Sequence, residues 1–268
     1  MNNKYLNTKD LKKLGVRCGK NCQVHETVIA NNYKKIILGS NVRIDAYSIL
    51  ITKNMDIKIG SYIHIGSHCY LSGQKGIEMK NFSGLGQGVK IYSVNDDYSG
   101  MSLTNPTTNS KNRKKVEQTG KVVIGKHVNI GANSIVLPNV KIGNGASVGS
   151  LSLVKNNLKG WFVYFGIPVL PLFKRSNEIL NLEKKFFKNE KKNNIDKKLL
   201  NILDKSLKNY NKKANIKMFD IPLYEKGLID SFDFINIISN IEKEFKIKIP
   251  INKIDAKTTI NSLKNELK

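Results

Sequence analysis

Aliphatic residues recur at every sixth position along residues 124–155, and glycine follows most of them, as in Ile124-Gly125 and Ile142-Gly143. An α-helix repeats every 3.6 residues and a plain strand every two, so neither produces this period. A coil of short strands joined by tight turns does produce it, because the aliphatic side chain fills the axis and glycine permits the positive φ of the turn. The pattern therefore predicts a repeating β coil.

The same six-residue step occurs upstream of this segment. It is found at Cys18-Gly19, Leu38-Gly39, Ile44-Asp45, Ile59-Gly60, Ile65-Gly66 and Leu85-Gly86. Three such strands per turn predict a triangular parallel β-helix. A polar interruption over 95–121, which includes Asn105-Pro106 and the basic run 111–115, predicts a protruding functional loop. The segment that follows Gly160 predicts an extended closure of the coil.

The hydrophobic period becomes helical toward the C-terminus. One amphipathic helix is indicated by Leu199, Leu200, Ile202, Leu203 and Leu207, and a second by Phe234, Ile237, Ile238, Ile241 and Phe245. Short helical segments are expected near 252–255 and 258–267. We predict a β-helix domain over 1–175, a helical, lysine-rich linker over 176–192 and a small four-helix bundle over 193–268.

The formal net charge of +24 suggests nucleic acid or an anionic membrane surface as a partner. The positive residues are almost all lysines scattered among asparagine and isoleucine, with no basic stripe interleaved with stacking aromatics. Nucleic acid is excluded on that ground. A solvated basic surface and an attraction to phosphorylated substrates both remain open.

The three cysteines, Cys18, Cys22 and Cys69, fit no disulfide framework and are expected as core thiols in a reducing compartment. The first fifteen residues contain no apolar signal core, and no later run is apolar for long enough to span a bilayer. We therefore predict a cytoplasmic protein without a transmembrane segment.

The stretch IGKHVNIGANSIVLPNVKIGNGASVGSLSLV and the Gly-Ile-Pro turn after it resemble the hexapeptide-repeat acyltransferases of the left-handed β-helix superfamily. The resemblance covers about residues 15–175. It implies a homotrimer with active sites in the clefts between subunits, where a sugar hydroxyl or amine attacks a thioester donor. It also implies strand crossovers of the unusual left hand.

The resemblance to the galactoside and maltose acetyltransferase branch implies the donor contacts. Ala132, Ser150, Val154 and Lys155 stand where that branch contacts coenzyme A, mostly through backbone atoms. Asn129 stands where the branch commonly has tryptophan, and we count it as a substrate-binding residue.

On the acceptor side, Asp96 occupies the place of the catalytic histidine of that branch. Asp96, Asp97 and Tyr98, followed by Asn-Pro-Thr, instead resemble a less studied branch of polysaccharide acetyltransferases, which has a histidine in the place of His64. His68 aligns with a sugar-binding asparagine. Both histidines are thus candidates, and Asp97 and Tyr98 are expected to bind substrate.

Counting six-residue steps places His64 and Asp96 at different corners of the triangle, too far apart to bond within one subunit. Across a trimer cleft they would form an imidazole base oriented by a carboxylate. The alternatives are an imidazole without a role and a turn-forming Asp pair. Zinc is not expected, because only His64 and His68 lie close in sequence, and His25 and His127 are expected at the surface.

The segment from Gly227 through Phe245, with Asp230-Ser231 at the start of a helix, resembles the acyl and aminoacyl carrier proteins. The resemblance covers about residues 193–268. It implies 4'-phosphopantetheine bound covalently to Ser231, a phosphopantetheinyl transferase and an enzyme that loads the acyl group. The alternative is that Ser231 is only the N-cap of its helix.

These observations predict an enzyme that transfers an acyl group from the carrier domain or from acyl-coenzyme A to a sugar or nucleotide-sugar acceptor, in surface polysaccharide or O-antigen biosynthesis. The alternative is a trimeric scaffold without catalysis that presents a carrier domain to another synthase.

Overall fold

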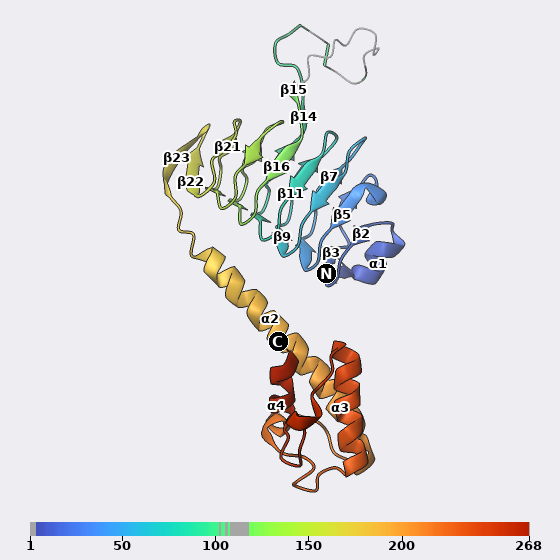
Figure 1. Cartoon of the computed structure of the whole chain (residues 1–268). Coiled ribbons are helices and arrows are strands. Elements are labelled where there is room, and N and C mark those ends of the chain that lie inside the picture. Colours follow the sequence, from blue (N-terminus) through green and yellow to red (C-terminus); the bar gives the residue numbers. More distant parts are fainter. Residues whose placement is uncertain (1–3, 102, 105–106, 108–117, 268) are drawn as a thin grey trace. The chain divides into compact units, whose positions relative to one another are not determined.

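The computed structural model describes residues 4–101, 103–104, 107 and 118–267. Two compact units follow each other along the chain, Met1–Ile179 and Leu180–Lys268. Figure 1 shows the first unit as a stack of β coils and the second as a group of helices.

The first unit has three sheets, one for each side of a triangular prism, and the strands of successive coils in each sheet pair in parallel. Sheet A contains β1 (Tyr5–Asn7), β3 (Gln23–His25), β6 (Val42–Ile44), β9 (Ile63–Ile65), β12 (Gly84–Leu85), β17 (Asn129–Ile130), β20 (Ser147–Val148), β22 (Phe162–Gly166) and β23 (Val169–Lys174), in that order. Sheet B contains β2 (Arg17–Cys18), β5 (Ile36–Leu38), β8 (Ile57–Ile59), β11 (Ile77–Met79), β16 (Val122–Ile124) and β19 (Lys141–Ile142). Sheet C contains β4 (Ile29–Ala30), β7 (Ile49–Ile51), β10 (Tyr70–Ser72), β13 (Lys90–Tyr92), β18 (Ile135–Val136) and β21 (Leu153–Val154).

Each coil passes through sheets B, A and C in turn, so the predicted left-handed parallel β-helix is confirmed. We call the turns between the sheets the B–A, A–C and C–B corners. A polar ribbon of β14 (Val94–Asn95) and β15 (Gln118–Thr119) leaves the coil at the C–B corner and marks the ends of the predicted loop. Asn105, Pro106 and the run 111–115 lie outside the described residues.

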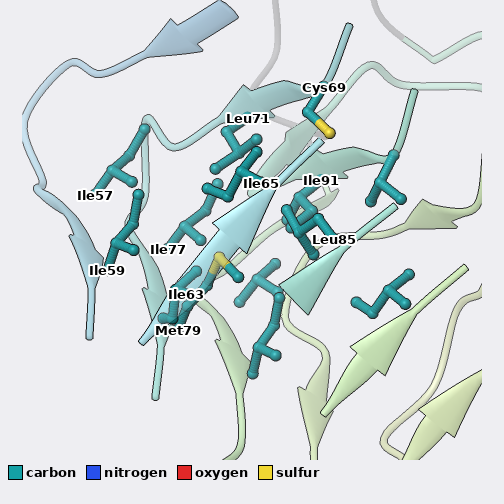
Figure 2. Close-up of a cluster of buried hydrophobic side chains, with 14 of the residues drawn as sticks. Ile57, Ile59, Ile63, Ile65, Cys69, Leu71, Ile77, Met79, Leu85 and Ile91 are labelled. Carbon is teal, nitrogen blue, oxygen red and sulfur yellow. The ribbon is translucent and has the colours of Figure 1, made fainter. Parts of the chain in front are cut away.

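The axis of the prism is filled by the aliphatic residues of the repeat. Ile57, Ile65, Leu71, Ile77 and Ile91 have no more than 1% of their surface exposed, and Figure 2 shows them packed in layers beside Met79 and Leu85. Burial of such side chains is worth roughly 1.5–3 kcal/mol each. Every coil thus contributes to one continuous core.

Close stacking of the corners explains the glycines of the repeat. A Cβ atom on Gly131 would lie 2.4 Å from the backbone N of Ser150 in the next coil, which no side chain tolerates. Gly84, in the middle of sheet A, is different, because a Cβ there would meet its nearest atom, the carbonyl O of His64, at 3.5 Å. The sheet face therefore has room at Gly84 that the corner lacks at Gly131.

Both ends of the β-helix are closed by non-repeating structure. At the N-terminal end β1 pairs antiparallel with β3, and α1 (Thr8–Lys13) buries Leu11 in the core. A short 3-10 turn, η1 (Tyr33–Lys35), precedes β5. At the other end β22 and β23 form an antiparallel hairpin, which confirms the expected extended closure.

The second unit is helical. Its elements are α2 (Ile179–Leu207), the 3-10 turns η3 (Lys208–Tyr210) and η4 (Ile216–Asp220), α3 (Ser231–Phe245), η5 (Ile251–Lys253), α4 (Ile260–Lys264) and η6 (Asn265–Leu267). Leu203, Phe219, Ile237, Ile241 and Leu263 meet in one core with at most 1% exposure. The predicted linker, 176–192, mostly lies in the first half of α2, whose buried residues begin at Leu199.

A pair of glycine substitutions tests the coil stacking. Gly131→Ala is expected to lower the unfolding free energy by about 1–3 kcal/mol, because the backbone of Ser150 has to move away. Gly84→Ala is the matched control and is expected to be close to neutral. Thermal unfolding followed by circular dichroism compares the two, and equal stabilities would contradict the stacking described here.

Candidate functional site

The outward face of sheet A carries a column of residues around His64, and most of them are polar. Arg43, His64, Gly84 and Asn129 occupy paired positions on four successive strands, β6, β9, β12 and β17. They alternate with the buried aliphatic residues of the same strands, so their side chains point to solvent. Because Gly84 has no side chain, the column is interrupted between His64 and Asn129.

A hollow of about 300 Å³ lies at this interruption. Its lining residues are Asp45, His64, Gly66, Gly84, Leu85, Gly86, Gln87 and Asn129. We call it the His64 hollow. It brings two of the predicted site residues, His64 and Asn129, to one surface.

His64 is paired with a carboxylate of its own chain. Its Nε2 lies 2.7 Å from Oδ2 of Asp45, which ends the preceding coil's pass through sheet A. A carboxylate accepts hydrogen bonds, so Nε2 carries the proton and, in the neutral ring, Nδ1 holds the lone pair. The pair has the arrangement of a general base with an orienting acid.

Asp45 itself is held by two further groups. Arg43 Nε donates to Oδ1 at 2.7 Å and the Tyr5 hydroxyl donates to Oδ1 at 2.8 Å. Arg43 also donates through Nη2 to the Tyr5 oxygen at 2.9 Å. The antiparallel strand β1 therefore delivers a side chain to the site.

Burial alone raises the pKa of Asp45, but hydrogen bonds from His64, Arg43 and Tyr5 outweigh it and bring this pKa below its ordinary value. The carboxylate is thus ionised at neutral pH. Burial is also the main cause that raises the pKa of Tyr5, so its hydroxyl stays protonated and donates.

The A–C corner next to the hollow contains three more of the predicted residues. At each level of this corner a backbone N–H group donates to the carbonyl of the first turn residue in the preceding coil, which aligns the corner as a column. The donors are His68, Gly88, Asn133 and Leu151. Ala132 and Ser150 lie on this column beyond Gln87, a lining residue of the hollow. His68 lies there too, and its exposed ring stacks on Tyr47 at 5.1 Å. The predicted donor contacts Ala132 and Ser150 therefore lie on a column of residues that adjoins the His64 hollow.

Four further predicted residues of the β-helix lie at the C–B corner, on the other side of sheet C: Asp96, Asp97, Tyr98 and Lys155. Asp96 is exposed just after β14. Oδ1 of Asp97 accepts from the N–H and the hydroxyl of Ser99, and Tyr98 is 81% exposed and donates to Asn95. Lys155 is exposed immediately after β21. The chain by itself does not bring this group to His64.

Several positions differ from the sequence expectations. His64 lies in the middle of β9, not at a corner, because Ile63 and Ile65 on both sides point into the core. The side chain of Val154 is fully buried, so only its backbone is available to a donor. His25 and His127 are 7% and 3% exposed, whereas a surface location was expected. Each histidine ring packs against a neighbouring aromatic ring, His25 against Tyr5 and His127 against Phe82.

Sequence reasoning missed Asp45, Arg43 and Tyr5. A signal for Asp45 was present, because Ile44-Asp45 carries an acid at the step where the next four coils have glycine. No local pattern marked Tyr5, since its role arises from the antiparallel pairing of β1 with β3.

The predicted attachment residue of the helical unit, Ser231, is the first residue of α3 and is exposed. The N-cap is Asp230, whose Oδ1 accepts from the N–H of Asp233 at 2.7 Å. The backbone of Asp230 is held in place as well, because its N–H donates a hydrogen bond to the Tyr210 hydroxyl at 3.0 Å. The alternative that Ser231 caps the helix is therefore wrong, and its hydroxyl is available. The positive end of the α3 dipole suits a phosphate bonded there.

Among the described residues, no group of three or more His, Cys, Asp or Glu side chains converges as a metal site would. In the same part of the chain, no helix combines the length and apolar character needed to cross a membrane.

Comparison with known proteins agrees with this fold. Residues 121–156 match the family described as bacterial transferase hexapeptide (six repeats), and residues 211–267 match the phosphopantetheine attachment site. The dTDP-4-amino-4,6-dideoxy-D-glucose acyltransferase of Escherichia coli is 36% identical over 183 residues, which are 68% of this chain and 94% of that enzyme. The chain belongs to the hexapeptide-repeat acyltransferases.

The solved structures extend the likeness to the whole β-helix of this acyltransferase. The N-acyltransferase AntD from Bacillus cereus, in complex with dTDP-4-amino-4,6-dideoxyglucose and coenzyme A as a serine-to-cysteine variant, is 39% identical, with a TM-score of 0.66. The match covers 70% of this chain and all of that one. A complex of AntD with dTDP and 3-hydroxybutyryl-CoA is 38% identical with the same TM-score and covers 70% and 99%. The predicted family, the enzyme class and the added carrier-type domain are thereby confirmed.

The lowered pKa of Asp45 gives a testable pH dependence of stability. A carboxyl whose pKa is lower when folded stabilises the fold above its unfolded pKa, about 3.9, and loses this contribution as the pH falls through the folded value. Asp45→Asn is expected to lower the unfolding free energy at pH 7 by on the order of 1 kcal/mol. This deficit should narrow as the pH falls below about 4, toward the lowered pKa of the folded state.

Urea unfolding at several pH values measures this deficit. Asp56→Asn, which removes an ion pair with Arg17 elsewhere on the coil, is the matched control. A deficit independent of pH would show that Asp45 is not held as an ionised partner of His64.

Proposed function

We propose that this enzyme transfers an acyl group from a thioester to the amine or hydroxyl of a sugar carried on a nucleotide. The observation that carries the proposal is the His64–Asp45 pair in a hollow that adjoins the column of Ala132 and Ser150. The relatives support the acceptor, since the Escherichia coli enzyme is named for a dTDP-amino sugar and AntD binds one.

In the proposed reaction the acceptor nitrogen or oxygen attacks the thioester carbonyl carbon from the His64 hollow. His64 Nδ1 takes the proton of the nucleophile as the new bond forms, and Asp45 stabilises the imidazolium through Nε2–H. The C–S bond then breaks, the sulfur leaves with the bonding electrons, and the same proton passes from Nδ1 to it. An amine acceptor depends less on the base than a hydroxyl does.

Asp45 takes the orienting role that the sequence assigned to Asp96. Asp96 remains a proposed catalytic residue of a different kind, one that reaches the acceptor from a neighbouring subunit together with Asp97 and Tyr98. His68 and Asn129 are proposed to contact substrate from the hollow's own chain.

A homotrimer is proposed to bring these groups together. The outward face of sheet C lies between the A–C and C–B corners and is largely apolar: Ile29, Ile49, Ile51, Tyr70, Tyr92, Ile135 and Leu153. Apolar residues on a sheet face outside the core favour packing against another copy. Contact there would place the C–B corner of one copy near the A–C corner of the next, where His64, Ala132 and Ser150 gather.

The carrier-type unit is proposed to hold 4'-phosphopantetheine on Ser231, after modification by a phosphopantetheinyl transferase and loading by a separate enzyme. The group supplies a thiol that carries the acyl chain. Ser231 fits it, because its exposed hydroxyl begins α3 while Asp230 performs the capping. Tethering in one chain raises the effective donor concentration to about the millimolar range. Surface polysaccharide synthesis and a cytoplasmic location stay predictions.

Acyl transfer to dTDP-4-amino-4,6-dideoxyglucose, followed by release of the free thiol, tests the reaction. His64→Ala is expected to lower kcat by about 10²-fold, the low end of the usual effect of losing a base, because the acceptor is an amine. Asp45→Asn is expected to lower kcat by about 10-fold, because the ring loses its orientation. Asp56→Asn is the carboxylate control. Light scattering on the same samples should show three chains per particle. Rates within twofold of wild type for both site variants would refute the assignment, and would favour the scaffold role if no other residue proved essential.

Coexpression with a phosphopantetheinyl transferase tests Ser231. The intact mass is expected to rise by about 340 Da, the mass that the arm adds through a phosphodiester. Ser231→Ala should stay unmodified, whereas Ser239→Ala, an exposed serine on the same helix, should be modified like wild type. Modification of Ser231→Ala would disprove the site. Full turnover of Ser231→Ala with acyl-coenzyme A would identify coenzyme A as a sufficient donor.

A further inference from the structure

Two exposed aromatic rings form a stack at the A–C corner, beside the His64 hollow. The rings of Tyr47 and His68 lie 5.1 Å apart, with an angle of 21° between their planes. We call this pair the ring stack. Each of its residues follows a lining residue of the hollow by two positions, because Asp45 and Gly66 open the same two turns. The ring stack and the hollow therefore share the successive coils that contain β6 and β9.

The exposed fraction of Tyr47 leaves one face of its ring open. His68 covers the other face, yet 51% of Tyr47 remains exposed. In the preceding coil the same place in the corner belongs to Thr27, a small residue whose hydroxyl accepts from the N–H of Tyr47 at 2.9 Å. That hydroxyl also bonds with Nδ1 of His25 at 2.8 Å, so the Thr27 side chain is already engaged within the corner. A further flat ring can therefore stack on Tyr47, with His68 behind it.

Folding of the coil does not explain aromatic residues at these two places. Tyr47 and His68 adopt positive φ of 61° and 59°. Bulky side chains disfavour this conformation, whereas Gly88 and Asn133, later in the same column, are residue types that accept it. Both rings are exposed and lie outside the core. Exposed aromatic faces of this kind are what proteins use to bind the flat rings of nucleobases.

The ring stack lies on the opposite side of the hollow from the predicted donor contacts. Along the A–C corner, Ser150 and Ala132 follow β20 and β17, and Tyr47 follows β6. Gly84, on β12, lies between these levels. Neighbouring strands are about 4.8 Å apart, so Tyr47 lies roughly 10 Å along the corner from the level of Gly84. A nucleotide sugar has its base and its sugar at separate places, because a ribose and two phosphates lie between them.

We propose that Tyr47, supported by His68, binds the nucleobase of the nucleotide-sugar acceptor by stacking. The acceptor part of this inference rests on the proposed function, whereas the affinity for a base rests on the ring stack alone. Coenzyme A also carries a base, adenine, but the donor column extends from the hollow toward Ser150, away from Tyr47. The acceptor base thus lies at the N-terminal end of the hollow, its sugar lies beside His64, and the thioester arrives from the C-terminal end.

Equilibrium binding of dTDP to the full chain, measured by calorimetry without an acyl donor, tests this site. Tyr47→Leu is expected to weaken dTDP binding by at least about fivefold, because the stacked ring is lost, and to leave coenzyme A binding unchanged. Leucine is accepted in this column, since Leu151 adopts a φ of 56° there. Tyr47→Phe keeps the ring and should bind dTDP like wild type. The matched control, Phe173→Ala, removes a ring that is 61% exposed on the terminal hairpin.

Four results would overturn the proposal. Weaker coenzyme A binding with unchanged dTDP binding would assign the ring stack to the donor. Unchanged binding of both ligands would show that the ring stack holds no base. An equal loss of dTDP binding in Tyr47→Leu and Tyr47→Phe would show that the ring face is not what binds. Fewer chains per particle for Tyr47→Leu, measured by light scattering, would assign the ring to a contact between subunits.

The same measurement separates this inference from the proposed function. If dTDP does not bind the unchanged protein, the nucleotide-sugar acceptor of the proposed function is wrong. If dTDP binds the unchanged protein and Tyr47→Leu equally well, only the stacking on Tyr47 is wrong. Because binding is measured without turnover, a base site that depends on Tyr47 would stand even if acyl transfer failed.

Discussion

The parallel hydrogen-bond ladder between successive coils is the constraint on which the structure depends. It holds each strand about 4.8 Å from the next and keeps the register unshifted, so that a residue of one coil lies directly beside its counterpart in the following coil. Residues of successive coils, such as His64 and Gly84 or Gly84 and Asn129, therefore form columns although they lie far apart in sequence. The buried columns make the core. Many corners combine a glycine that close stacking requires with a positive φ two residues later, and the outward columns are free to carry chemistry.

The outward column of sheet A shows how chemistry arises from this register. Arg43 and Asp45 share one face near the end of β6, and His64 pairs with Arg43 in the next coil, so the imidazole comes within 2.7 Å of the carboxylate. Tyr5 completes the group from the antiparallel strand β1. The glycine in the following coil then leaves the imidazole facing open space instead of another side chain. Position in the repeat, more than any single motif, creates the site.

The helical unit exposes a serine hydroxyl at the start of α3 in a different way. The Asp230 carboxylate accepts a hydrogen bond from a free N–H at the start of α3, and the Asp230 backbone is held by Tyr210. The side chain of the next residue is therefore not needed to cap the helix. The Ser231 hydroxyl is left exposed at the positive end of a fifteen-residue helix. Asp230 and Asp233 flank it within a lysine-rich chain.

By itself the sequence determined the β-helix, its closure, the helical unit and the identity of the exposed Ser231, because each depends on a period or a local motif that neighbouring residues carry. It also indicated four candidate site residues one by one: His64, Asn129, Ala132 and Ser150. Only the tertiary structure decided which of them share a surface, that Asp45 and not Asp96 holds His64 within the chain, and that His25 and His127 are buried. A six-residue repeat specifies which way a side chain points, but not how many coils separate it from its partner. That number depends on the loops and on the end strands, which follow no period.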